Sequence, residues 1–197
     1  MGRIDCASAV RPLFRSMSES GDLALTYGDE RACLIALIDV LGHGANARKV
    51  AVKAGECVEE LQSESPSAII EGLHRRLAGT RGAVAAVCRF DAESGLLRYA
   101  GVGNIALRTI GRQSESFITA DGVLGYGVVH AAVKEQKLLP GTTLIMHSDG
   151  ISTHFDILEF PGLPYKSAAA IAQGLLERFG ARDDDASCIV MKYTQQG

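Results

Sequence analysis

The sequence lacks a long apolar run, a Cys-x-x-Cys pair, and any block of Lys or Arg longer than two residues. Its best apolar stretch, residues 32–40, is interrupted by Asp39 and is far shorter than the roughly 20 residues of a membrane-spanning helix. The 20 basic and 23 acidic side chains leave a net charge of −3. This balance disfavours nucleic acid or an anionic membrane as the main partner, and we expect a water-soluble protein.

Features of an exported protein are also missing. Asp5 stands where a secretory signal needs its apolar segment. Five cysteines are scattered without any motif pairing, and most of them lie in apolar runs, which is typical of reduced and buried thiols. They are Cys6, Cys33, Cys57, Cys88 and Cys188. We therefore expect a cytoplasmic location.

Internal repeats, low-complexity tracts and long linkers are absent, so residues 1–197 are predicted to form a single domain large enough to bury its own core. Eight short apolar runs rich in β-branched residues predict strands. These runs are residues 23–27, 32–38, 83–90, 96–100, 105–110, 131–138, 143–147 and 188–193. Helical periodicity appears at 46–61, 66–77 and 168–179. This grouping favours an α+β fold with antiparallel sheets.

Three predicted strands carry aspartate at one end, although aspartate is depleted inside strands. Asp39 and Asp149 each follow an apolar run, and residues 183–185, which include Asp184, precede the last run. If these ends meet, the carboxylates form a cluster that must bind a cation or raise a pKa. Oxygen ligands suit Mg²⁺ or Mn²⁺. Taken singly, each aspartate is more typical of a turn, a helix cap or a solvated loop than of a ligand.

Three motifs in this order carry a resemblance to a known family. Asp-Val-Leu-Gly-His-Gly at 39–44 resembles the Asp-x-x-Gly-His-Gly signature of the metal-dependent Ser/Thr phosphatases (PPM family), in its sporulation and stress-response branch. Leu-Pro-Gly-Thr-Thr-Leu at 139–144, leading to Ser-Asp-Gly at 148–150, resembles the next motif of that branch. Asp-Asp-Ala-Ser at 184–187 resembles its closing motif. The chain is also similar in size to the stressosome feedback phosphatases of that branch.

The resemblance implies a β-sandwich of two antiparallel sheets flanked by helices on both sides, with two Mn²⁺ or Mg²⁺ ions at one edge. By motif match, Asp39 would bridge both ions and the Val40 carbonyl would bind one of them. Asp149 and Asp184 would bind the other ion. Paired divalent ions activate water for direct attack on phosphorus, so the resemblance implies hydrolysis without a covalent enzyme intermediate.

Two further residues are assigned by the resemblance with alternatives left open. Asp22 occupies the early Gly-Asp position and would contact a metal ion directly or through water. The match departs from the family at Ser20 and Leu23, so Asp22 could instead simply begin a strand. His43 could protonate the leaving serine or threonine oxygen near neutral pH. Alternatively, the Gly-His-Gly segment serves only the turn that starts the following helix.

The function implied by the resemblance is dephosphorylation of phosphoserine or phosphothreonine on STAS-domain proteins of a stressosome, as negative feedback on a stress response. A phosphoprotein-binding regulator without turnover is the alternative within the same fold. A two-metal nuclease or phosphodiesterase is disfavoured by the charge. The segment 151–165, with its two prolines, is expected to border the site. Residues 101–106 match a dinucleotide fingerprint, but the alternating residues that follow predict a strand and not the required helix.

Overall fold

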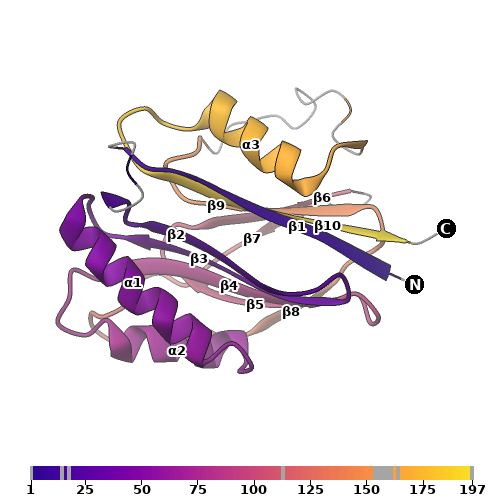
Figure 1. Ribbon diagram of the computed structural model, residues 1–197. Coiled ribbons are helices and arrows are strands. Elements are labelled where there is room, and N and C mark those ends of the chain that lie inside the picture. Colours follow the sequence, from indigo (N-terminus) through magenta and orange to yellow (C-terminus); the bar gives the residue numbers. More distant parts are fainter. Residues whose placement is uncertain are drawn as a thin grey trace.

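The protein folds as a four-layer stack in which two β-sheets lie between helices (Figure 1). The computed structural model describes residues 2–13, 16, 19–111, 114–152, 162 and 165–195. The strands are β1 (Gly2–Arg11), β2 (Asp22–Gly28), β3 (Ala32–Val40), β4 (Ala83–Asp91), β5 (Leu96–Val102), β6 (Ala106–Ile110), β7 (Ser116–Phe117), β8 (Lys134–Lys137), β9 (Thr142–His147) and β10 (Ala186–Gln195). The helices are α1 (Ala45–Glu60), α2 (Pro66–Arg76) and α3 (Ala168–Phe179).

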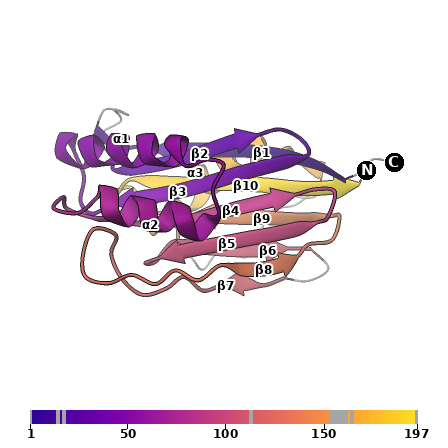
Figure 2. The same cartoon turned by 90° about the horizontal axis from the view of Figure 1, so that it is seen from below.

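Both sheets are antiparallel throughout. One has the strand order β1-β10-β9-β6-β7 and the other the order β2-β3-β4-β5-β8. Figure 2 shows α1 and α2 lying across the second sheet, whereas α3 covers the outer face of the first (Figure 1). The predicted α+β sandwich with helices on both sides is therefore confirmed. Within the described part of the chain, a helix pair covers one sheet and a single helix covers the other.

Strands at the centre of the second sheet are buried on both faces. In β3, Ile35 and Leu37 point into the space between the sheets, while Ala36 and Ile38 pack under the helices. Strand β4 alternates in the same way. Successive strand residues face opposite sides, so a strand covered on both sides must be apolar at nearly every position. This explains why β3 and β4 appear in the sequence as continuous apolar runs.

The helix boundaries follow their capping residues. Ser65 accepts a hydrogen bond from the Ala68 amide at 3.3 Å, with Pro66 at the first helical position of α2. Ser167 caps α3 in the same way. Both helices, α2 and α3, lie within the ranges 66–77 and 168–179 predicted from helical periodicity. No helix in the described ranges is long and apolar enough to cross a membrane.

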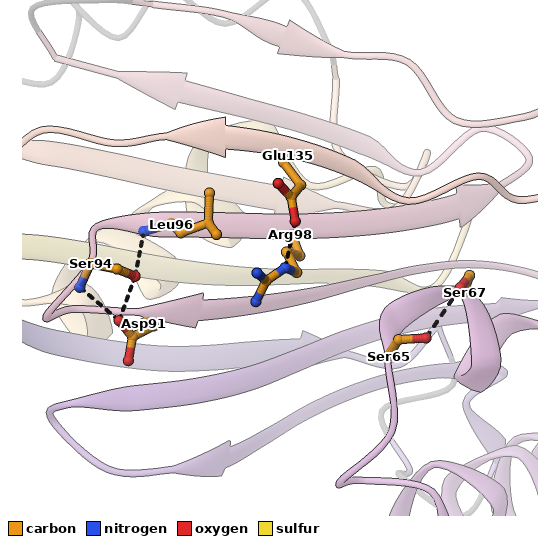
Figure 3. A network of polar contacts seen from close by, with 7 residues as sticks. All are labelled: Ser65, Ser67, Asp91, Ser94, Leu96, Arg98 and Glu135. Carbon is orange, nitrogen blue, oxygen red and sulfur yellow. Dashed lines mark hydrogen bonds and ion pairs between the residues drawn. The ribbon is translucent and has the colours of Figure 1, made fainter.

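A tight turn joins β4 and β5 into an antiparallel hairpin (Figure 3). The Asp91 carboxylate accepts hydrogen bonds from the Ser94 amide at 2.7 Å and the Ser94 hydroxyl at 2.5 Å. These contacts close the turn and fix the register of both strands. On β5, the Arg98 guanidinium pairs with Glu135 of β8 at 2.6 Å.

Two strands were not predicted, and one prediction was too long. β1 mixes small and polar residues, so it contains no apolar run from which a strand could be predicted. It nevertheless pairs with β10 along its whole length. β7 has only two residues. The predicted strand 131–138 shrinks to β8 because the edge of β5 beyond Tyr99 is occupied by Ala120, whose amide bonds the Gly101 carbonyl at 2.8 Å.

Candidate metal and active site

Asp22 and Asp39 lie opposite each other at one end of the sandwich. Asp22 is the first residue of β2, and the antiparallel register pairs it directly with Asp39 near the end of β3. The preceding Gly21 has no room for a side chain, since a Cβ there would lie 3.0 Å from the Val40 carbonyl and 2.9 Å from the Gly42 carbonyl. The glycine thus permits the turn after β3 to pack against the start of β2.

Asp22 is buried and is held by two serines of the other sheet. Its Oδ2 accepts hydrogen bonds from the Ser148 hydroxyl at 2.7 Å and the Ser187 hydroxyl at 2.6 Å. Burial raises the pKa of the Asp22 carboxyl to about 6, while the two hydroxyls act in the opposite direction. In the described residues no donor reaches its other oxygen, Oδ1.

Asp39 is the most strongly perturbed carboxyl of the group. Burial, followed by repulsion from Asp22, Asp149 and Asp184, raises the pKa of Asp39 to about 9. The Asp149 side chain acts on Asp39 in the same direction. With a pKa near 9, Asp39 holds a proton at neutral pH when no cation is bound.

Asp149 and Asp184 reach the same cluster from the ends of β9 and β10. Both are exposed. Asp149 accepts a hydrogen bond at 2.9 Å from the side-chain amide of Asn104, in the loop before β6. Burial and then repulsion from Asp149 raise the pKa of Asp184, and the nearby His43 acts in the opposite direction. His43 therefore belongs to this site, close to Asp184.

Asp185, the neighbour of Asp184, has a different role. It is buried, and its carboxylate accepts hydrogen bonds from the Leu13 amide at 2.7 Å and the Gly21 amide at 2.8 Å. A carboxylate that satisfies two buried amides fixes the chain segments that carry them. Asp185 thus fastens the segment after β1 and the residue before Asp22 to the start of β10.

The structure brings together every side chain that the sequence prediction proposed, namely Asp22, Asp39, His43, Asp149 and Asp184. However, no group of three or more His, Cys, Asp or Glu side chains in the described ranges is already arranged to hold a metal ion. The sequence prediction gave no role to Asn104, Asp185 or the two serines. Ser148 and Ser187 stand inside the quoted motifs, and Asn104 lies in the rejected dinucleotide match, so position alone could have drawn attention to them.

Other predicted features have clear outcomes. The five cysteines are free thiols, four of them buried, and burial raises the pKa of Cys188 to about 12, which disfavours a thiolate nucleophile. The segment predicted to border the site falls mostly on residues 153–161 and 163–164, outside the described residues. A cavity of about 630 Å³ lies at the other end of β2, beside Thr26, Tyr27 and Lys192, away from the clustered aspartates. Asp5 and Asp29 also line this cavity, but none of the residues assigned by the resemblance does.

Comparisons with known proteins found a family model, a related sequence and several similar structures. The family model "Stage II sporulation protein E (SpoIIE)" matches residues 29–194. The phosphoserine phosphatase RsbX of Bacillus subtilis (strain 168) is 27% identical over 139 residues, which is 67% of each chain. A solved structure titled as a study of the bacterial stressosome is 29% identical, with a TM-score of 0.84, and the match covers 98% of this chain and 100% of that one.

Two further solved structures are similar in fold. RsbX in complex with magnesium has a TM-score of 0.84 at 22% identity, covering 98% of this chain and 96% of that one. The catalytic domain of the serine/threonine phosphatase PstP, with two manganese ions, has a TM-score of 0.76 at 16% identity, covering 99% and 100%. At these identities the likeness shows the fold, which is that of the PPM phosphatases.

Proposed function

Since this chain belongs to the stage II sporulation protein E (SpoIIE) family, we propose that it is a metal-dependent phosphatase acting on phosphoserine or phosphothreonine in proteins. The observation that carries the proposal is the cluster of four carboxylates, Asp22, Asp39, Asp149 and Asp184, at the matching ends of strands from both sheets. Similarity to the phosphoserine phosphatase RsbX supports the reaction class.

The residues fit divalent cations. After burial, the charges of neighbouring carboxylates raise the pKa of Asp39, and protonation of Asp39 relieves their repulsion. A divalent cation neutralises such a cluster more completely than one proton, and carboxylate oxygens are the ligands that Mg²⁺ and Mn²⁺ prefer. Because no ligand group is closed in the described ranges, we propose that carboxylate side chains turn toward the ion when it binds.

We assign the ligands as follows. Asp39 would bridge two Mn²⁺ or Mg²⁺ ions, the Val40 carbonyl would bind one, and Asp149 and Asp184 would bind the other. Asp22 would offer Oδ1, directly or through water, since Oδ2 is held by the two serines. Bound divalent ions would supply activation of water and neutralisation of the phosphoryl charge.

The chain's own residues would do the remaining work. Asn104 would orient Asp149 through its amide, and Ser148 and Ser187 would orient Asp22. His43, close to Asp184, is the proposed donor of a proton to the leaving serine or threonine oxygen. A nucleophilic side chain is not required in this scheme.

The proposed substrate is a phosphorylated STAS-domain protein of a stressosome, in a feedback circuit that ends a stress response. Similarity to RsbX and to the structure from the stressosome study supports this partner class. The free, mostly buried cysteines are consistent with the reducing cytoplasm, which is the location we propose.

A turnover assay tests the proposal. The wild-type protein should release phosphate from a phosphoserine peptide and from a small aryl phosphate only with added Mn²⁺ or Mg²⁺, and should leave DNA intact. Asp39→Asn and Asp149→Asn should lose at least a hundredfold in turnover, about 2.7 kcal/mol of barrier. The matched control is Asp29→Asn, in an exposed turn outside the cluster.

Three other outcomes of this assay would contradict the proposal. Metal-dependent binding of the phosphopeptide without turnover by the wild type would favour the regulator that binds phosphoproteins. Cleavage of DNA would favour the nuclease. Near-native turnover by folded Asp39→Asn would show that the ligand assignment is wrong.

A further inference from the structure

A single arginine lies against the turn that follows Asp39. In the register of β3 and β4, Val40 pairs with Ala83, and the Leu41 amide continues this pairing by donating to the Gly82 carbonyl at 3.2 Å. Next along, Arg81 lies beside Gly42. A Cβ on Gly42 would be only 2.9 Å from Nη1 of Arg81 and 3.7 Å from Cζ. The guanidinium therefore packs on the backbone of the Gly-His-Gly turn.

The segment that carries Arg81 is firmly held. The Thr80 amide and hydroxyl both donate to the Leu77 carbonyl, at 3.0 and 2.7 Å, and the Gly82 amide donates to the Thr80 hydroxyl at 3.1 Å. From the long loop before β8, the Tyr126 hydroxyl donates to the Thr80 carbonyl at 2.8 Å. Gly82 has a φ of +77°, and a Cβ there would meet Tyr126 at 2.8 Å. The backbone of Arg81 is thus preorganised.

The guanidinium has no ion-pair or hydrogen-bond partner in the part of the chain that the structure describes. Other arginines of the fold, such as Arg3, Arg76 and Arg98, each pair with a glutamate. Arg81 is half-buried. A half-buried, unpaired guanidinium on a fixed turn, adjoining a carboxylate cluster, is arranged to receive an anion that comes to that cluster.

We propose that Arg81 binds the phosphoryl oxygens of the substrate through its guanidinium fork. The inference rests on the proposed function and adds to it the side chain that recognises the phosphate. A site of four carboxylates repels a phosphoryl dianion, and Arg81 places a permanent positive charge at its border. Arginine suits this task because its planar donors match two phosphate oxygens at once, whereas lysine offers a single point charge.

The test compares Arg81→Met and Arg81→Lys with the wild type in the presence of saturating Mn²⁺. We expect Arg81→Met to raise KM for a phosphoserine peptide and the inhibition constant of inorganic phosphate by tenfold or more, with a smaller change in kcat. Arg81→Lys should show smaller increases than Arg81→Met in both KM and the inhibition constant. A small aryl phosphate should suffer the same loss as the peptide, because the contact is with the phosphoryl group. Arg75→Met, on the exposed face of α2, is the matched control.

The outcomes separate the two proposals. A folded Arg81→Met or Arg81→Lys with unchanged KM and phosphate inhibition would overturn the role of Arg81, as would a loss confined to the peptide. If the wild type shows no metal-dependent turnover, the proposed function fails. Calorimetric binding of inorganic phosphate to the Mn²⁺-loaded proteins then decides the role of Arg81: weaker binding by both variants supports it, and equal binding overturns it.

Discussion

Asp22 and Asp39 face each other across β2 and β3, as register partners in the antiparallel ladder. Two carboxyl groups directly opposite on neighbouring strands repel when both are ionised. Here the two groups also share a buried environment, so each raises the free energy of the other's charged form. Protonation relieves this repulsion. Burial raises the pKa of Asp39 to about 9 and that of Asp22 to about 6, so Asp39 is protonated at neutral pH. The site is therefore destabilising whenever it is empty and fully ionised.

The first prediction concerns Asp39→Asn without metal. The pKa of Asp39 rises from 3.8 to about 9 on folding. Stability of the metal-free wild type is therefore lost progressively as the pH rises from about 4 to about 9. Asp39→Asn removes this dependence, so its melting temperature with EDTA should exceed that of the wild type at pH 8 and approach it at pH 4. Thermal melts at both pH values, with Asp29→Asn as control, check this. A lower melting temperature for Asp39→Asn at pH 8 would contradict the repulsion.

The second prediction concerns the proton that Asp39 holds. A divalent cation bound at Asp39 must displace this proton, since the pKa of Asp39 lies near 9. Binding of Mn²⁺ at pH 7 should release at least one proton per chain, and the apparent affinity should rise with pH up to about 9. Calorimetry in buffers of different ionisation enthalpy measures the proton count. The idea fails if binding is independent of pH between 6 and 9.

The sequence reveals the strand ends of the site but not its supports. Asp39 and Asp149 follow apolar runs, so their place at one edge was predictable from patterning. The contacts of Asp185 with Leu13 and Gly21 join residues more than 160 positions apart. No local pattern reports such contacts, since they depend on how the two sheets stack. The unpredicted β1 is another case, because its small and polar residues form no apolar run and its strand is defined by pairing with β10, the last strand of the chain.

The third prediction follows from Asp185. Replacing it with alanine leaves the buried Gly21 amide and the Leu13 amide without acceptors, at a cost of about 2–4 kcal/mol of unfolding free energy. Asp185→Asn keeps one acceptor oxygen and should lose less. Urea unfolding of both variants measures the difference. The exposed neighbour Asp183 supplies the control, and Asp183→Ala should be close to neutral. Equal stability of Asp185→Ala and the wild type would show that these contacts do not hold the site.

The fourth prediction concerns Asn104, whose side chain contacts the proposed ligand Asp149. Its amide donates to Oδ2 of Asp149, which is exposed. Asn104→Leu removes the donor at similar volume. Asp149 then loses more side-chain conformational entropy when it binds the ion. The Mn²⁺ concentration for half-maximal turnover should therefore rise about tenfold, the equivalent of about 1.4 kcal/mol.

At saturating Mn²⁺, kcat of Asn104→Leu should return close to that of the wild type, because Asn104 acts through Asp149. The control is Asn46→Leu, in the exposed first turn of α1. A titration of turnover against Mn²⁺ gives both quantities. A loss of kcat that saturating Mn²⁺ does not restore would mean that Asn104 contacts the substrate itself. An unchanged Mn²⁺ titration would mean that the hydrogen bond from Asn104 does not contribute to metal binding by Asp149.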